Sequence, residues 1–387
     1  MAEKNLDFDT VIDRTHTNSL KYDFAVQRGK PKDVLPLWVA DMDFQVSSYI
    51  QEALSGSVAH GIFGYSEAEG SYFEAVAGWM SRHYGGNVEE TWLVKTPGIV
   101  FALAQAVRAF TEPGDAVLLQ QPVYYPFSQV IRDNGRKIVD NTLVQGEDGR
   151  YRIDFTDFEE KIRSCKVKLF FLCNPHNPVG RVWTKEELLR LGDICEKYGV
   201  IVVSDEIHAD FVFEGSHQVL AGLKESYRKF VVTCTAPSKT FNLAGLQVSN
   251  IFIPDDALRR KFEQAVAASG YSQLNTMGLV ACEATYRHGG EWYDAVKSYI
   301  RENLAYAQLF LEEQFEVDTD FRSQKGRLLC HNGTLRRDLH RHDLARHCGS
   351  KGDHALSALG GVVVLEHGFT GERTAEHLAQ SATLGLH

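Results

Sequence analysis

A lysine in a turn rich in small and hydroxyl-bearing residues is the clearest candidate nucleophile. Lys239 lies in the stretch TCTAPSKTFNLAGLQVSN at 233–250, which follows an apolar run at 230–232. That run predicts a strand ending in a half-buried pocket, where desolvation lowers the pKa of an amine and makes it nucleophilic. Because a neutral amine forms an imine with an aldehyde, we interpret Lys239 as the covalent anchor of a cofactor. A solvated surface lysine is the alternative for an isolated Ser-Lys-Thr.

Three other apolar runs upstream of Lys239 also end in polar residues. These ends are Tyr124-Tyr125 after the run 116–119, NPHNPVG at 174–180 after the run 168–173, and SDEIH at 204–208 after the run 199–203. In an open α/β sheet, ligands bind outside the carboxyl ends of the strands. We therefore expect the four polar ends to converge on one crevice. A pair of ordinary core aromatics is the alternative for the two tyrosines.

A predicted helix start offers a site for an anion. Apolar residues recur at three- and four-residue spacing from Ile99 to Phe110, which predicts a helix that begins after Gly98. The unpaired backbone N–H groups at Gly98, Ile99 and Val100 can bind a phosphate without a lysine or arginine. Any capped helix has these features, so the pattern alone is not specific. Further helical patterns lie at 185–197, 256–268 and 292–315.

Composition and charge fit a protein that binds small molecules. The chain has 387 residues, of which 44% are hydrophobic and 24% charged, as is ordinary for a soluble globular protein. A net charge of −10 argues against binding to nucleic acid or an anionic membrane. Seven cysteines without a Cys-x-x-Cys motif suggest reduced core thiols, and no ligand spacing predicts a metal site near His208. Without a signal peptide or membrane-length apolar run, we expect a cytoplasmic protein.

The motifs together resemble those of pyridoxal 5′-phosphate (PLP) enzymes of fold type I, the aspartate aminotransferase fold. Within that group, PVYYPF at 122–127, SDEIH at 204–208 and APSKTFN at 236–242 are similar to the carbon–sulfur β-lyases of the MalY, PatB and cystalysin branch, the cystathionine β-lyases. The resemblance covers the chain up to about residue 320. It implies an α/β fold with a mostly parallel mixed sheet covered by helices, and a smaller α+β domain formed from both termini.

For the cofactor ring, the resemblance implies a set of contacts at the strand ends. Lys239 binds PLP covalently, and Asp205 keeps the pyridine nitrogen protonated so that the ring can accept electrons. Tyr124 stacks on the ring, a contact that suits its electron-rich face, while Tyr125 faces the substrate. Asn177 donates to the phenolic oxygen of the ring. His208 lies near the same phenolic oxygen, at the position where aminotransferases commonly carry a tyrosine.

For the cofactor phosphate, the resemblance implies contacts from Ser238, from the helix start at 98–100 and from Tyr65 of a second subunit. Aminotransferases usually carry an arginine eight residues after the lysine, whereas this chain has Gln247. The resemblance therefore implies a homodimer in which Tyr65 crosses the interface. A solvent-facing turn tyrosine is the alternative.

The expected domains are an N-terminal arm with part of the small domain at 1–45, a large PLP-binding domain at 46–287 and a C-terminal small domain at 288–387. The segment LPLWVADMDF at 35–44 is expected beside the substrate entrance, with a plain buried strand as the alternative.

The tail at 321–387 departs from the family pattern. Eight of the fifteen histidines lie after Asp320, and the arginine-x-asparagine motif that holds the substrate α-carboxylate is missing. Arg373 is only the nearest arginine to the expected position. One hypothesis is that the tail is translated in a shifted reading frame. We accordingly predict PLP binding at Lys239, but a raised KM and a low kcat toward amino acids.

The resemblance implies α,β-elimination from cystathionine, cysteine or an S-alkyl cysteine, giving a thiol, pyruvate and ammonia. The freed Lys239 would remove the substrate α-proton. It also implies a place in amino-acid metabolism, namely methionine biosynthesis. Two alternatives remain open: a class I/II aminotransferase, and a regulatory protein of this fold that senses a ligand with little turnover.

Overall fold

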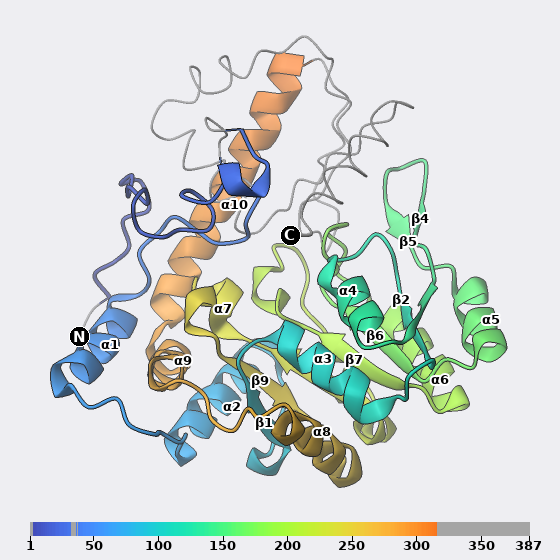
Figure 1. Cartoon of the computed structure of the whole chain (residues 1–387). Helices are drawn as coiled ribbons and strands as arrows, with labels where there is room; N and C mark the ends of the chain where they lie inside the picture. Colours follow the sequence, from blue (N-terminus) through green and yellow to red (C-terminus); the bar gives the residue numbers. More distant parts are fainter. Residues whose placement is uncertain (1–2, 32–35, 37, 316–387) are drawn as a thin grey trace. The chain divides into compact units, whose positions relative to one another are not determined.

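A computed structural model describes residues 3–31, 36 and 38–315 of the chain (Figure 1). Contacts divide the chain into two compact units. Among the described residues, the first contains Val46–Tyr293, and the second contains most of Asn5–Gln45 together with the part of α10 (Gly290–Phe315) that begins at Asp294. The predicted domain ranges 1–45, 46–287 and 288–387 stay predictions.

A seven-stranded sheet forms the centre of the first unit. Its strand order is β1 (Leu93–Thr96), β9 (Ser249–Phe252), β8 (Val231–Thr235), β7 (Ile201–Asp205), β6 (Leu169–Cys173), β2 (Ala116–Leu119) and β3 (Lys137–Asp140). Strands β8, β7, β6, β2 and β3 run parallel, and β9 is antiparallel to both of its neighbours. This mostly parallel mixed sheet confirms the α/β fold that the sequence predicted.

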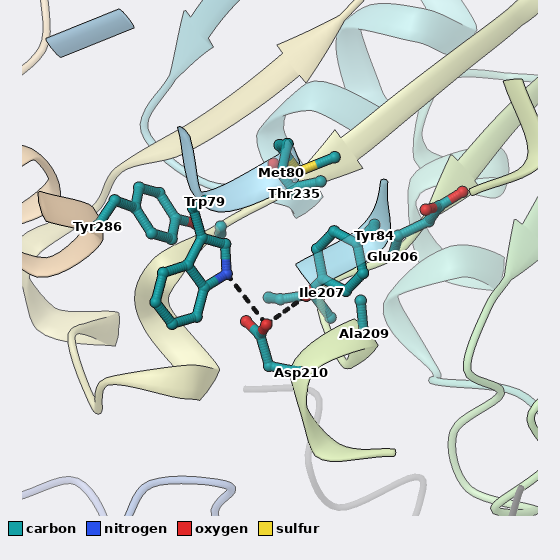
Figure 2. A pocket seen from close by; sticks show the side chains of 10 residues that line it. Trp79, Met80, Tyr84, Glu206, Ile207, Ala209, Asp210, Thr235 and Tyr286 are labelled. Carbon is teal, nitrogen blue, oxygen red and sulfur yellow. Dashed lines mark hydrogen bonds between the residues drawn. The ribbon is translucent and has the colours of Figure 1, made fainter. Parts of the chain in front are cut away.

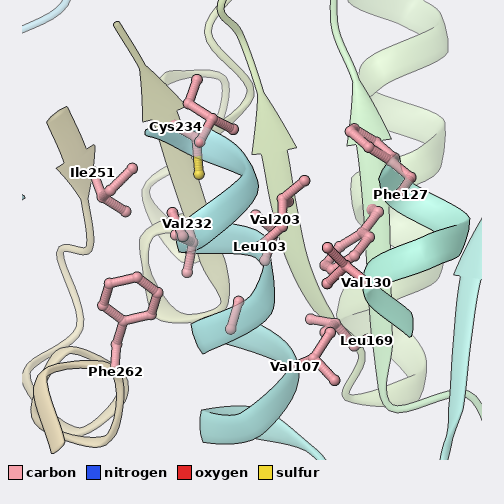
Figure 3. Packing of buried hydrophobic residues seen from close by; sticks show 14 of the residues in the cluster. Leu103, Val107, Phe127, Val130, Leu169, Val203, Val232, Cys234, Ile251 and Phe262 are labelled. Atoms are coloured by element: carbon pink, nitrogen blue, oxygen red, sulfur yellow. The ribbon is translucent and has the colours of Figure 1, made fainter. Parts of the chain in front are cut away.

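Both faces of the sheet are buried, because side chains alternate between two apolar clusters. On one face, Val232 and Leu169 pack with α3 (Ile99–Phe110), α4 (Pro126–Asp133) and α8 (Asp256–Ala268) (Figure 3). On the other face, the intervening strand residues pack against α5 (Phe155–Cys165) and α6 (Lys185–Tyr198). This double cover explains why the strands read in the sequence as nearly continuous apolar runs.

The remaining elements of the described chain are α1 (Ser48–His60), α2 (Gly70–Tyr84), β4 (Val144–Gln145), β5 (Tyr151–Arg152), α7 (Pro237–Thr240), α9 (Thr276–His288), α10 (Gly290–Phe315) and six short 3₁₀ turns. The helices predicted at 99–110, 185–197, 256–268 and 292–315 are confirmed as α3, α6, α8 and α10. A capping box in which Thr184 and Glu187 satisfy each other's backbone N–H groups fixes the start of α6.

The second unit contains a cluster of buried charges. Lys21 is fully buried and its Nζ lies 3.0 Å from a carboxylate oxygen of Asp43. Arg14 contacts the carboxylates of both Asp41 and Asp43. No strand forms in the described part of the segment at 35–44, so the alternative of a plain buried strand is wrong for those residues. The predicted place of the segment beside the substrate entrance stays a prediction.

Candidate active site

The carboxyl ends of parallel strands bring the predicted site segments to one edge of the sheet. Backbone hydrogen bonds join the segments beyond the strands themselves. The N–H of Asn174 donates to the carbonyl of Asp205 at 2.9 Å, and the N–H of Glu206 donates to the carbonyl of Cys234 at 2.9 Å. The N–H of Tyr124 donates to the carbonyl of Asn177 at 3.0 Å. The segments that follow β2, β6, β7 and β8 are therefore neighbours, as expected.

Asp205 is a buried carboxylate at the centre of this edge. It ends β7, paired in register with Cys173 of β6 on one side and Cys234 of β8 on the other. The backbone N–H of Ile207 donates to its Oδ1 at 3.2 Å. Burial, together with the negative charge of Glu206, raises the pKa of Asp205 to about 7, against the opposing effects of that hydrogen bond and of the positive charge on Lys239. The site thus holds a carboxyl group whose negative charge the chain does not fully compensate.

Lys239 lies on α7, the single helical turn that follows β8. Its side chain is half-buried, as is that of the preceding Ser238. The positive charge of Lys239 acts on both Asp205 and His208. Burial first, and this charge second, lower the pKa of His208 to about 3. The imidazole of His208 is therefore neutral at neutral pH, and the structure brings Lys239, Asp205 and His208 together.

The two tyrosines after β2 differ in exposure. Tyr124 is 37% exposed, whereas Tyr125 is 70% exposed, and their ring centroids lie 5.5 Å apart. Burial, followed by the charges of Tyr125 and Asp205, raises the pKa of Tyr124 to about 12. This electrostatic coupling locates Tyr124 near Asp205. Asn177 is half-buried beside them, and its backbone N–H donates to the Sγ of Cys173 at 3.3 Å. Neither tyrosine is an ordinary core aromatic.

The predicted phosphate contacts are distributed over several elements. Gly98 precedes α3 in an extended conformation, and no side chain caps that helix. A Cβ added at Gly98 would meet nothing within 4 Å, so the backbone there is open to close approach. Gln247 is exposed, in the left-handed conformation that follows a 3₁₀ turn. Tyr65 lies in an extended segment after α1 and is 98% exposed, so the first unit of its own chain does not cover it.

Glu206 and Asp210 belong to the segment around His208 for which the sequence predicted no metal site. Within the described chain, no group of three or more histidine, cysteine, aspartate or glutamate residues is placed to hold a metal. Glu206 instead accepts hydrogen bonds from the hydroxyl of Ser204 at 2.8 Å and from Nε2 of His217 at 2.7 Å.

Asp210 is likewise occupied by hydrogen-bond donors. It accepts a hydrogen bond from Trp79, and both residues line a small cavity together with Ile207 and Ala209 (Figure 2). The sequence carried no signal for these contacts, because Trp79 lies more than a hundred residues upstream and has no motif around it.

These residues fit a pyridine cofactor with a phosphate group. The uncompensated carboxyl group of Asp205 suits a protonated ring nitrogen, and the half-exposed Tyr124 offers a ring face beside it. The charge of the half-buried Lys239 acts on Asp205, and the open backbone at Gly98 begins a helix suited to an anion. The arginines proposed for the substrate carboxylate, including Arg373, and the hypothesis of a shifted reading frame concern residues outside the described part of the chain.

Comparisons with known proteins agree with this geometry. The family model "Aminotransferase class I and II" matches residues 32–330. Over 310 residues, the chain is 46% identical to the cystathionine beta-lyase PatB of Bacillus subtilis, covering 80% of both proteins. It is 32% identical to the protein MalY of Escherichia coli, covering 78% of this chain and 77% of that protein.

Solved structures give the same result. Cystalysin from Treponema denticola, which contains PLP, superposes with a TM-score of 0.76 at 36% identity, covering 79% of this chain and 78% of cystalysin. The PLP-bound C-S lyase from Staphylococcus hominis superposes with a TM-score of 0.74 at 34% identity, covering 80% of this chain and 77% of that one. The chain belongs to the class I and II aminotransferase family, with the PLP fold of type I. Within it, the chain falls in the branch of carbon–sulfur lyases, as the sequence predicted.

Proposed function

We propose that the protein is a PLP-dependent carbon–sulfur β-lyase that acts on cystathionine, cysteine or an S-alkyl cysteine. Its products are a thiol, pyruvate and ammonia. The observation that carries the proposal is the buried, uncompensated Asp205 next to Lys239 at the joined strand ends. The chain's similarity to PatB and to cystalysin supports this choice within the family.

Pyridoxal 5′-phosphate is the cofactor of this activity, and solved relatives contain it. When bound, PLP supplies an electron sink for the electron pair released at the substrate α-carbon. Asp205 holds the proton on the pyridine nitrogen. Lys239 would bind the cofactor covalently and, once freed by the substrate amine, would take up the α-proton. The β-sulfur would then leave as a thiolate with the electron pair of the C–S bond.

The ring is oriented by Tyr124, Asn177 and His208. Tyr124 stacks on the ring face, and its half-buried position near Asp205 supports this role. Asn177 donates its amide to the phenolic oxygen. His208 contacts the same oxygen as a neutral imidazole, because its lowered pKa prevents it from carrying a second positive charge beside Lys239. Tyr125 is exposed and faces the incoming amino acid.

The phosphate is held by Ser238, by the backbone of Gly98, Ile99 and Val100, and by Tyr65 of a partner subunit. A homodimer therefore completes the site. The exposure of Tyr65 and of its neighbour Phe63, at 98% and 62%, supports an interface at this segment.

We further propose that the protein works in the cytoplasm, in methionine biosynthesis. All five cysteines of the described chain are free thiols, which fits a reducing compartment. No helix of the described chain is long and apolar enough to span a membrane.

The experiment that tests the proposal follows two reactions of the PLP-loaded protein. With L-cystathionine alone, we expect a free thiol and pyruvate to appear in equal amounts. With an amino acid and a keto acid, we expect no comparable transfer of the amino group. Amino transfer that depends on the keto acid, without thiol release, would instead identify an aminotransferase. Retained PLP absorbance without either product would identify a ligand-sensing protein.

A further inference from the structure

A second buried carboxylate, Asp210, lies five residues after Asp205 and has no part in the proposed function. It belongs to the 3₁₀ turn Ala209–Phe211 and is 6% exposed. A carboxylate is costly to bury unless hydrogen-bond donors or cations surround it. The contacts of Asp210 therefore show what its charge is used for.

Three side-chain donors from two helices converge on Asp210. Nε1 of Trp79 donates to Oδ1 at 3.1 Å, and the hydroxyl of Tyr84 donates to the same oxygen. Figure 2 shows both residues, which lie on α2, pointing at the carboxylate. The hydroxyl of Thr240 donates to the other oxygen, Oδ2. Both carboxylate oxygens are thus occupied, and the Thr240 contact links Asp210 to α7.

Thr240 is the residue directly after Lys239, on a helix too short to hold its own direction. Helix α7 has four residues and no side-chain cap. A single turn is unstable by itself, so its orientation depends on tertiary contacts. Thr240 is fully buried, and its branched side chain has few rotamers, so its hydroxyl fixes the adjoining backbone when it binds Asp210.

We propose that Asp210 is a positioning residue which, through Thr240, sets the direction in which the Lys239 side chain leaves the backbone. The inference rests on the proposed role of Lys239 as the covalent anchor of PLP. The short segment 205–210 would then act on two groups of the reaction, the ring nitrogen of the cofactor and the lysine amine. Asp205 faces the ring nitrogen, and Asp210 holds the turn that carries the amine. Misplacing a reacting group by about 1 Å can slow a reaction roughly a hundredfold.

The test compares three substitutions in the full-length protein. The T240V variant removes the hydroxyl but keeps the branched shape, whereas T240S keeps the hydroxyl. The T233V variant is the matched control, because Thr233 is buried on β8 and its hydroxyl has no hydrogen-bond partner in the described chain. Asp210→Ala would not separate the two roles, because it would leave three donors unpaired, two of them buried, and destabilise the fold.

Two measurements separate positioning of the lysine from support of the pocket. The first is the rate at which the apo protein forms the borohydride-reducible bond with PLP. The second is the dissociation constant of pyridoxamine 5′-phosphate, which has an amine in place of the aldehyde and cannot bond to a lysine. Peptide mapping of the reduced wild-type protein comes first, because it identifies the lysine that carries the label.

We expect T240V to slow covalent loading about tenfold or more, the factor that corresponds to one lost hydrogen bond to a charged group. T240S and T233V should load within about twofold of wild type, and all three variants should bind pyridoxamine 5′-phosphate as wild type does. Wild-type loading by T240V would overturn the inference, as would an equal loss of affinity for pyridoxamine 5′-phosphate. A label on a lysine other than Lys239 in the wild type would overturn the proposed anchor itself.

Discussion

Asp43 and Asp205 are both buried carboxylates, yet the chain treats their charges differently. The side chain of Asp43 is 5% exposed and is met by Arg14 and by the fully buried Lys21. Asp205 is 6% exposed and makes no ion pair with a lysine or arginine of the described chain. The charge of Asp43 is neutralised by cations of the second unit, whereas the carboxyl group of Asp205 has a pKa raised to about 7. The difference supports the proposal that Asp205 pairs with a cation that is not part of the protein, namely the protonated ring of the cofactor.

The largest expected effect is at Lys239, the proposed covalent anchor of the cofactor. Replacing Lys239 with alanine should abolish both turnover and the borohydride-reducible bond to PLP, because no other amine stands at this position. Absorbance of the bound cofactor and mass analysis after reduction provide the measurement. A reducible bond that persists in K239A would show that the anchor lies elsewhere.

Replacing Asp205 with alanine should lower the elimination rate by several orders of magnitude while still allowing PLP to bind covalently. The reason is that the pyridine nitrogen loses the carboxylate that keeps it protonated, so the ring becomes a poor electron sink. Single-turnover kinetics with cystathionine measure the rate. A rate close to that of wild type would show that the uncompensated charge of Asp205 has no role in the chemistry.

At the compensated carboxylate, the expected effect is on stability. The D43N variant leaves the buried Lys21 with a hydrogen bond to the carbonyl of Asp41 at 3.0 Å, but with only the longer ion pair to the Asp41 carboxylate, at 3.5 Å, among the described residues. Breaking a buried ion pair in this way costs about 3–5 kcal/mol of unfolding free energy. Urea unfolding measures the change. The D41N variant is the control, since Asp41 is 23% exposed and its loss should cost less. An equal loss of unfolding free energy in D43N and D41N would show that the buried charge of Asp43 is not specially stabilised, and would contradict its contrast with Asp205.

Substitution of Asp205 should stabilise the apo protein, in contrast to the loss of stability expected for D43N. Its folded pKa of about 7 lies above its usual value, so the folded chain keeps a proton that the unfolded chain loses. The stability contributed by this group is therefore present at low pH and lost as the pH rises from about 4 to about 7.

The D205N variant lacks this loss and should be more stable than wild type by up to about 4 kcal/mol at pH 8. His176 and His208 titrate with lowered pKa values in both proteins, so their contributions cancel in the difference. Urea unfolding of both apo proteins between pH 4 and pH 8 provides the measurement. A difference that does not change with pH would show that Asp205 is already compensated.

The smallest expected effect concerns the phosphate end of the cofactor. Removing the hydroxyl of Tyr65 in a Y65F variant should weaken cofactor retention by about fivefold to tenfold, as for one hydrogen bond. The rate of PLP release on dilution measures it, after the native mass has established a dimer. Mixed dimers of Y65F and K239A subunits then show which subunit Tyr65 serves. Unchanged release would remove Tyr65 from the site.

The sequence predicted the strand ends well because each buried strand of a doubly covered sheet reads as an apolar run with polar residues after it. The segments that carry Lys239, Asp205, His208 and Tyr124 were predicted in this way. They meet at one edge because β2, β6, β7 and β8 pair in parallel. The sequence could not predict the contacts of Asp210, because its partners come from α2 and α7 and depend on how those helices pack. The buried charges at Asp43 were missed for the same reason.

The backbone hydrogen bonds that continue past β6 and β7 have a consequence for the motion of the site. The N–H groups of Asn174 and Glu206 are held by the same kind of ladder as the sheet itself. Opening these segments requires breaking sheet hydrogen bonds, so they belong to the cooperative core rather than to a loop that fluctuates independently. Their conformational entropy is lost when the protein folds, and an arriving cofactor meets a surface that is already rigid.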